Sequence, residues 1–154
     1  MPVIQRHGGK VDKYLGDGIL ASFGAIGPGG SHAADLCRAV EELDRSARAW
    51  RAERCQRGLQ APPVGMAGAA GDVVFGTVGH ETRLEYTVIG EVVNLAVKLE
   101  KHTKREGVAV LLTRQALDLA TAQGYRPRVA LRQMPGCRVE GIDDPVDLVA
   151  LVAD

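Results

Sequence analysis

The chain has 154 residues and a mass of 16.4 kDa, a length that fits one domain. With 45% hydrophobic and 25% charged residues, it has the composition of a folded domain, which excludes a disordered or fibrous chain. Nineteen basic and nineteen acidic residues leave no net charge, which argues against nucleic-acid binding through a broad basic surface. Because no apolar run has the length of a membrane span and no signal peptide is recognised, we expect a cytoplasmic protein without a membrane segment.

The residues that most often carry chemistry form no general motif. The three cysteines, Cys37, Cys55 and Cys137, are odd in number and widely spaced, which favours reduced thiols and excludes a zinc pattern. The four histidines are scattered, and no phosphate-binding loop or paired Cys-x-x-Cys motif occurs. Function must therefore be sought in longer segments.

The first predicted element is a β-hairpin that covers residues 11–23. Apolar residues flank Gly16-Asp17-Gly18, and Asp-Gly between two apolar stretches indicates a tight turn. Since side chains alternate along a strand, Val11, Lys13 and Leu15 are expected on one face, with Asp17 at the tip.

A helix is predicted after a glycine-proline stretch at residues 24–30. Ser31 is a good N-cap, apolar residues then recur at three- and four-residue steps, and Gly58 is a suitable stop. The apolar stripe predicts packing against a sheet. Two i,i+4 ion pairs are expected on the solvent-exposed side, Glu41–Arg45 and Asp44–Arg48.

Short strands and helices alternate through the rest of the chain. Strands are predicted at residues 64–70, 72–78, 86–89, 108–112, 129–133 and 146–152, with a polar loop at 80–85. Helices are predicted from Gly90 through residue 103, and from the cap Thr113 to Gly124. This order indicates an α+β fold, an α/β sandwich with helices packed on one sheet, in one domain that spans residues 1–154.

Two segments carry a resemblance to a known family. One is residues 8–23 (GGKVDKYLGDGILASF), and the other is residues 86–100 (YTVIGEVVNLAVKLE), preceded by residues 71–79 (GDVVFGTVG). Together, and in this order, they resemble the catalytic domain of the class III adenylate/guanylate cyclases over nearly the whole chain. The resemblance implies a ferredoxin-like domain with a mainly antiparallel sheet, and a head-to-tail homodimer with nucleotide sites between its subunits.

The family's reaction gives these residue types a purpose. The ribose 3′-OH of a nucleoside triphosphate attacks its own α-phosphate and pyrophosphate leaves, with metal ions that neutralise the phosphates. The resemblance makes Asp17 a ligand of Mg²⁺ or Mn²⁺, because it matches one of the family's two metal-binding aspartates. A carboxylate on a hairpin turn suits Mg²⁺, although Asp-Gly alone would indicate only a turn.

The base-reading positions favour ATP. Lys13 matches the adenine-reading lysine of the family, where guanylate cyclases carry a glutamate, and Thr87 matches the second base-reading position. A lysine donates to acceptor nitrogens of adenine, whereas a carboxylate suits the N–H groups of guanine. Gly16 and Gly90, which neighbour the matched positions, are expected to border the substrate.

The helix after Gly90 carries the expected catalytic pair. Asn94 matches the asparagine that orients the ribose, and Lys98 stands where the family has an arginine that stabilises the transition state. Their i,i+4 spacing keeps both on one helix face. Lysine keeps the charge but loses the planar fork that binds two phosphate oxygens, so we expect slower turnover.

Two further departures weaken the match. Glu140 occupies a place where the family usually has a basic residue that reaches the triphosphate, and Arg138 is a displaced substitute. The family's first strand, with the other metal aspartate, has no counterpart, so we expect an N-terminally truncated or degenerate domain whose sheet has unpaired edges. Asp12 and Asp72 are poor replacements for that aspartate.

The sequence therefore predicts a cyclase that converts ATP to cyclic AMP and pyrophosphate in signal transduction. Lys13 and Asp17 are close in sequence, so we expect them to serve different sites of a homodimer. The alternative is a catalytically inactive cyclase-like module that dimerises or binds nucleotide for regulation. A ferredoxin-like RNA-binding domain is disfavoured because the strands lack stacking aromatic residues.

Overall fold

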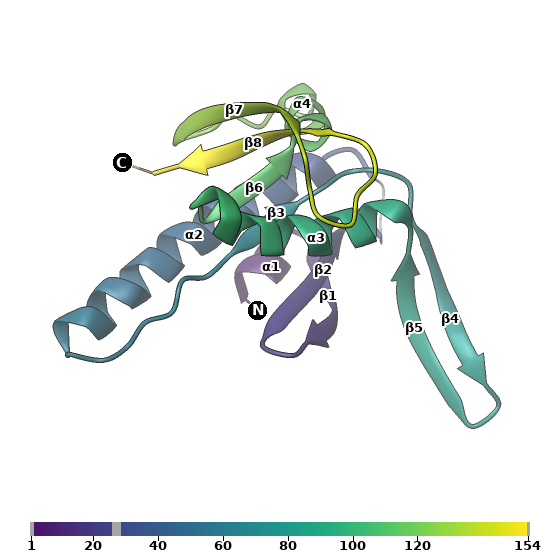
Figure 1. Ribbon diagram of the computed structural model, residues 1–154. Coiled ribbons are helices and arrows are strands. Elements are labelled where there is room, and N and C mark those ends of the chain that lie inside the picture. Colours follow the sequence, from purple (N-terminus) through teal and green to yellow (C-terminus); the bar gives the residue numbers. More distant parts are fainter. Residues whose placement is uncertain (1, 26–28, 154) are drawn as a thin grey trace.

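The computed structural model describes residues 2–25 and 29–153, so part of the glycine-proline stretch before the long helix lies outside the described residues (Figure 1). Four helices and eight strands are described, in this order along the chain: α1 (Pro2–Arg6), β1 (Gly9–Leu15), β2 (Gly18–Phe23), α2 (His32–Gln56), β3 (Met66–Gly68), β4 (Val74–His80), β5 (Arg83–Ile89), α3 (Glu91–Glu106), β6 (Val110–Thr113), α4 (Arg114–Ala122), β7 (Ala130–Cys137) and β8 (Val146–Val152). None of the described helices has the length and hydropathy to cross a membrane.

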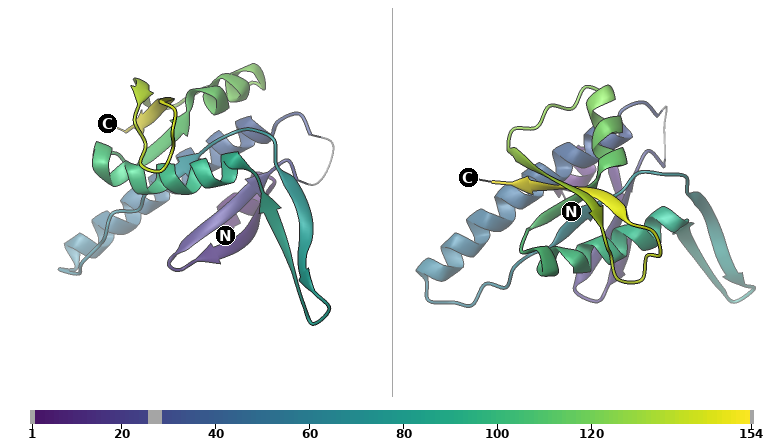
Figure 2. Two further views of the ribbon diagram at one scale, coloured as in Figure 1. Left: turned by 45° about the vertical axis from the view of Figure 1, so that its right-hand side comes forward. Right: turned by 45° about the horizontal axis from the view of Figure 1, so that its top comes forward.

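A four-stranded sheet forms the centre of the molecule, in the order β3-β6-β8-β7. The short strand β3 runs parallel to β6, and the other pairs are antiparallel. Helices α2 and α4 cover one face of this sheet and α3 covers the other (Figures 1 and 2). The expected α+β architecture, with helices packed on a mainly antiparallel sheet, is confirmed.

Strand alternation divides the core between the two faces of the sheet. Val110 and Leu112 pack with α2, α4 and Tyr125, whereas Leu111 packs with Leu99 of α3. All five side chains are at most 1% exposed. The sheet is therefore buried on both faces, which fixes α3 on the side opposite α2.

Two hairpins stand apart from this sheet. The β1–β2 and β4–β5 pairs each form a separate two-stranded antiparallel sheet, and β4–β5 extends away from the body in every view (Figures 1 and 2). Within the described residues, the second edges of β2 and β3 pair with no strand. On the β1–β2 hairpin, the carboxylate of Asp12 and the hydroxyl of Ser22 are buried without a hydrogen-bond partner. Open edges also occur in the described residues at β1, β4, β5 and β7, so the missing first strand stays a prediction.

The register of the β1–β2 hairpin corrects one prediction. A bulge between Val11 and Lys13 shifts the pairing, so that Val11 lies opposite Ala21 and Lys13 lies opposite Leu20. Adjacent residues of β2 point to opposite faces, and the extra residue of the bulge therefore places Val11 on the face away from Lys13. The prediction that both share one face was wrong.

Helix α2 differs from its prediction in its polar contacts. Ser31 makes no side-chain cap and donates instead to Asp35 at 2.5 Å. The Asp44–Arg48 pair is confirmed at 3.0 Å, but Asp44 is only 6% exposed. Glu41 makes no ion pair with Arg45 in the described structure, because it is buried against the segment that follows α4. The supposed solvent side of the helix is therefore partly covered.

The predicted caps and strands of the second half are largely correct. The hydroxyl of Thr113 accepts from the Ala116 N–H at 3.1 Å, which confirms the cap of α4. The predicted polar loop at 80–85 is too long, because β5 begins at Arg83 and a tight turn joins it to β4. All three cysteines are free, as expected.

Candidate functional site

The turn between β1 and β2 carries Asp17 at an exposed position. Gly16 has φ of +65°, in the left-handed region that a residue with a side chain rarely adopts, so glycine allows the turn to close. Lys13 lies on β1 and is also exposed. The chain thus holds the lysine and the carboxylate on one rigid hairpin, separated by roughly 13 Å at most in extended chain.

Strands β1 and β5 lie side by side. The Lys10 Nζ stands 4.0 Å from the centroid of the Tyr86 ring, a cation–π contact that joins the two hairpins. Lys10 and Lys13 pair with Ser22 and Leu20, which share a face of β2, so the bulge brings both lysines to one face. The β5 residue that meets this face is Tyr86. Its neighbour Thr87 is half-buried on the other face of β5.

Gly90 joins β5 to α3 and must be glycine for a steric reason. A Cβ at this position would lie 2.8 Å from the Asp72 carbonyl oxygen, closer than real Cβ contacts allow. No side chain caps the helix, and the exposed Asn94 lies in its first turn. The free N–H groups and the helix dipole give this end a positive potential.

Lys98 follows one turn later and lies beside a loop from the C-terminal part of the chain. A Cβ on Gly141 would lie 2.7 Å from the Lys98 Nζ, and Gly141 has φ of +81°. Glycine therefore permits the loop between β7 and β8 to run against this lysine. The helix α3 is unbroken from Glu91 to Glu106, so Asn94 and Lys98 share one face as predicted.

The loop that carries Gly141 offers no clear basic substitute. Glu140 is exposed and makes no ion pair with Lys98 in the described part of the chain. The Arg138 Nη1 donates to the Asp143 carbonyl at 3.3 Å within the same loop. The guanidinium of Arg138 is thus held within its own loop by this contact.

The described residues do not form a metal centre on their own. They contain no cluster of three or more His, Cys, Asp or Glu side chains that could hold an ion. Asp17 stands as a single exposed carboxylate, whereas Mg²⁺ takes several oxygen ligands in strict geometry. Among the described residues, Asp17 alone therefore does not fit a complete Mg²⁺ site.

Two contacts in this region could not be predicted from the sequence. One is the pairing of Lys10 with Tyr86, and the other is the position of Gly141 against Lys98. The first joins side chains more than 70 residues apart in sequence, and the second involves a loop more than 40 residues from Lys98. Neither produces a local sequence signal, apart from the glycine itself.

Comparison with known proteins places this geometry in a family. No protein-family model matches the chain. Over 152 residues, 97% of the chain, it is 32% identical to an adenylate cyclase of Anabaena cylindrica, and over 149 residues it is 38% identical to an uncharacterized protein of Mycobacterium bovis. The chain spans only 29% and 24% of the lengths of these two relatives.

Solved structures give the same answer for the fold. The guanylyl cyclase Cya2 superposes with a TM-score of 0.74 at 28% identity, over 99% of this chain and 74% of that one. The adenylyl cyclase CyaB from P. aeruginosa superposes with a TM-score of 0.76 at 22% identity, over 99% and 76%. The chain therefore belongs to the class III adenylyl/guanylyl cyclase catalytic domains.

Proposed function

We propose that this chain is the catalytic domain of an adenylate cyclase, which converts ATP to 3′,5′-cyclic AMP and pyrophosphate. The observation that carries the proposal is the arrangement of the matched residues. Strand β1 with Lys13 lies beside β5 with Thr87, and β5 continues through Gly90 into α3, which presents Asn94 and Lys98 on one face. Lys13, Asn94 and Lys98 thus lie on elements that are adjacent or connected in the fold, whereas Thr87 faces away from Lys13.

Each residue has a role in this proposal. Lys13 contacts adenine and Asn94 orients the ribose, whereas Thr87, half-buried on the β5 face away from Lys13, does not share a surface with that lysine. Lys98 lies against the α-phosphate, where its charge stabilises the negative charge that grows as the 3′-oxygen bonds to phosphorus and the bond to the pyrophosphate oxygen breaks. The 3′-OH proton leaves to solvent. Asp17 would hold Mg²⁺ or Mn²⁺ only together with oxygen ligands that the described residues do not supply beside it, and the ion would neutralise the phosphates.

The preference for ATP depends on the base-reading residues alone. One structural neighbour is a guanylyl cyclase and another an adenylyl cyclase, so the fold does not discriminate between the nucleotides. Lys13 is exposed on β1, where a cation favours the acceptor nitrogens of adenine. Product formation from ATP and from GTP, measured side by side, tests this preference, and faster turnover of GTP would contradict it.

Homodimerisation with sites between the subunits is supported by apolar surface on the two hairpins. Of the thirteen large apolar side chains that are exposed in the described residues, eight lie on these hairpins: Tyr14, Leu15, Ile19, Val74, Val78, Leu84, Tyr86 and Ile89. Such a concentration of exposed apolar surface is typical of an interface. A second copy of the chain that covers it would bring the Asp17 of one subunit toward the Lys13 of the other.

A complementation assay tests the shared site. Lys13→Ala and Asp17→Ala should each abolish cyclic AMP formation, and their mixture should recover about a quarter of wild-type activity, because half of the dimers are mixed and each has one intact site. Lys104→Ala, which removes an exposed lysine from the far end of α3, should leave activity unchanged. Active wild type without any rescue would contradict the shared sites.

The second candidate function is a regulatory module without catalysis. It is favoured by Lys98 in place of an arginine, by the exposed Glu140, and by the isolated position of Asp17. The absence of product from ATP or GTP with both Mn²⁺ and Mg²⁺, together with dimer formation in sedimentation experiments, would support this alternative over the cyclase.

A further inference from the structure

A pocket lies on the side of the sheet opposite α3. It has a volume of about 340 Å³ and is formed where the end of α1, the middle of α2 and the segment after α4 meet. Because α2 and α4 cover one face of the central sheet and α3 the other, this pocket is separate from the proposed nucleotide site. Most of its lining side chains are charged or polar.

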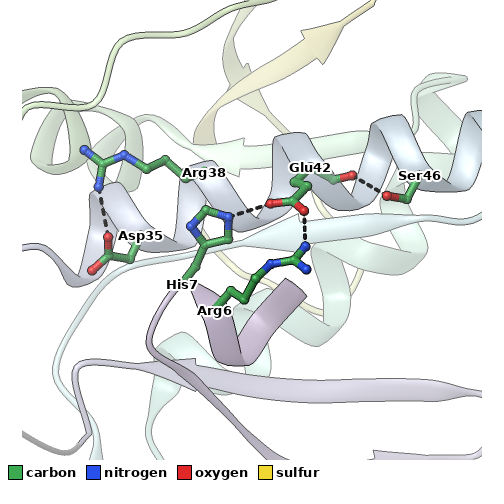
Figure 3. Close-up of polar contacts among 6 residues, drawn as sticks. All are labelled: Arg6, His7, Asp35, Arg38, Glu42 and Ser46. Atoms are coloured by element: carbon green, nitrogen blue, oxygen red, sulfur yellow. Dashed lines mark hydrogen bonds and ion pairs between the residues drawn. The ribbon is translucent and has the colours of Figure 1, made fainter. Parts of the chain in front are cut away.

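The two carboxylates in this pocket already have donors. Glu41 is buried, and its Oε1 accepts from the Tyr125 hydroxyl at 2.6 Å and from the Arg128 N–H at 2.9 Å. Glu42 accepts from Arg6 and, at 2.8 Å, from the His7 Nε2 (Figure 3). The pKa of Glu42 is held below its usual value, chiefly by the hydrogen bond from His7. Both carboxylates are thus committed to contacts within the protein.

The guanidinium groups of the pocket are not matched in the same way. Arg38 forms an ion pair with Asp35 at 2.9 Å (Figure 3). Arg126 donates to two backbone carbonyls, and because carbonyls are neutral, the charge of Arg126 stays uncompensated. For Arg45 and Arg128, the described residues contain no side-chain hydrogen-bond or ion-pair partner. Three guanidiniums, those of Arg45, Arg126 and Arg128, therefore have no carboxylate partner among the described residues.

We propose that this pocket binds a small phosphate-bearing anion. A guanidinium offers a planar fork of donors that matches two phosphate oxygens, and several such forks around one cavity are typical of phosphate recognition. The carboxylates of Glu41 and Glu42 are fixed by Tyr125 and His7 and form part of the cavity wall. The guanidiniums of Arg45, Arg126 and Arg128 are then available to the ligand. The volume lies at the lower end of the range for small-molecule sites, about 300–1,000 Å³, and the polar lining disfavours an apolar ligand.

Isothermal titration calorimetry of the full chain with inorganic phosphate tests the proposal. The double variant Arg45→Gln with Arg128→Gln should weaken binding at least about tenfold, since each lost charge-assisted bond contributes on the order of a factor of ten. Both side chains are exposed, and glutamine retains the backbone N–H that Glu41 accepts, so the variant should fold. The matched control is Arg105→Gln, an exposed arginine on α3.

Vesicles of phosphatidylcholine with and without phosphatidate distinguish a lipid headgroup from a free anion. If the wild type binds inorganic phosphate and the double variant does not, the result supports the proposal with a free anion as the ligand. Co-sedimentation with phosphatidate vesicles alone, also lost in the double variant, supports it with a lipid source. The absence of both, or an equal loss in Arg105→Gln or Lys98→Ala, would overturn it. Because no cyclase activity is measured, failure here is distinct from failure of the proposed function.

Discussion

The hydrogen bond between Tyr125 and Glu41 should contribute measurably to the free energy of unfolding. Tyr125 is 1% exposed, and its hydroxyl lies 2.6 Å from a carboxylate that is itself 7% exposed. Tyr125→Phe keeps the buried ring and removes only this donor. A hydrogen bond to a charged acceptor contributes about 1.5–3 kcal/mol, and we expect a loss of stability of that size.

Glu41 has a second donor, which separates the effect of the hydroxyl from that of the carboxylate. The Arg128 N–H remains at 2.9 Å after Tyr125→Phe, so the carboxylate is not left without a partner. Glu41→Ala removes the acceptor for both donors and should destabilise the protein more than Tyr125→Phe does. Tyr125→Phe and Glu41→Ala each remove the same hydrogen bond. The loss of stability in the double variant should therefore be smaller than the sum of the losses in the two single variants.

Urea denaturation followed by circular dichroism measures these free energies. The wild type, the two single variants and the double variant form a double-mutant cycle, whose coupling energy isolates the Tyr125–Glu41 interaction. A change of less than about 0.5 kcal/mol for Tyr125→Phe, the range of ordinary surface substitutions, would refute the assignment of this contact as a buried charge-assisted bond.

Three further predictions concern α3 and the thiol of Cys37. Lys98→Arg should raise cyclic AMP turnover about tenfold by restoring a two-pronged phosphate donor, and a fall in turnover would show that the loop at Gly141 excludes the larger group. Leu99→Ala, at a side chain with 0% exposure on α3, should cost about 2–5 kcal/mol in urea denaturation, and a loss under about 1 kcal/mol would contradict its place in the core. Burial raises the pKa of the Cys37 thiol to about 12. The charge of Glu41 adds to this effect, and that of Arg38 opposes it. Since the unfolded thiol ionises near 9.0, stability should fall as the pH rises from about 9 toward 12, and Cys37→Ala should flatten that decline, whereas an unchanged slope would refute the shift.

Local periodicity explains which parts of the fold could be predicted. Helices α3 and α4 follow from apolar spacing, from Gly90 and from the cap Thr113, because each of these signals acts within one helical turn. The bulge in β1 could not be predicted, since Asp12 has an ordinary strand context and only pairing with β2 reveals the extra residue. The face assigned to Val11 was therefore wrong although the hairpin itself was right.

Glu41 illustrates the same limit for long-range contacts. Its spacing from Arg45 predicts a surface ion pair, which is a small local energy of about 0.3–0.5 kcal/mol. The hydroxyl of Tyr125, 84 residues away, offers a buried charge-assisted bond instead, and the chain adopts that alternative. A tertiary contact of this kind outweighs the helical pair, and nothing in the sequence around Glu41 indicates it.

Asn94 and Lys98 could be proposed from the sequence, whereas the pocket could not, for a related reason. Asn94 and Lys98 belong to one continuous segment, so a motif can describe them before the fold is known. The pocket arginines come from α2 and from the segment after α4, and they meet only when both pack on the same face of the sheet. A net charge of zero over the chain therefore argues against a broad basic surface. It does not exclude a cavity in which folding gathers arginine side chains. In this pocket, the carboxylates of Glu41 and Glu42 accept hydrogen bonds from donors of the protein itself. The arginine side chains around them therefore leave a local positive charge.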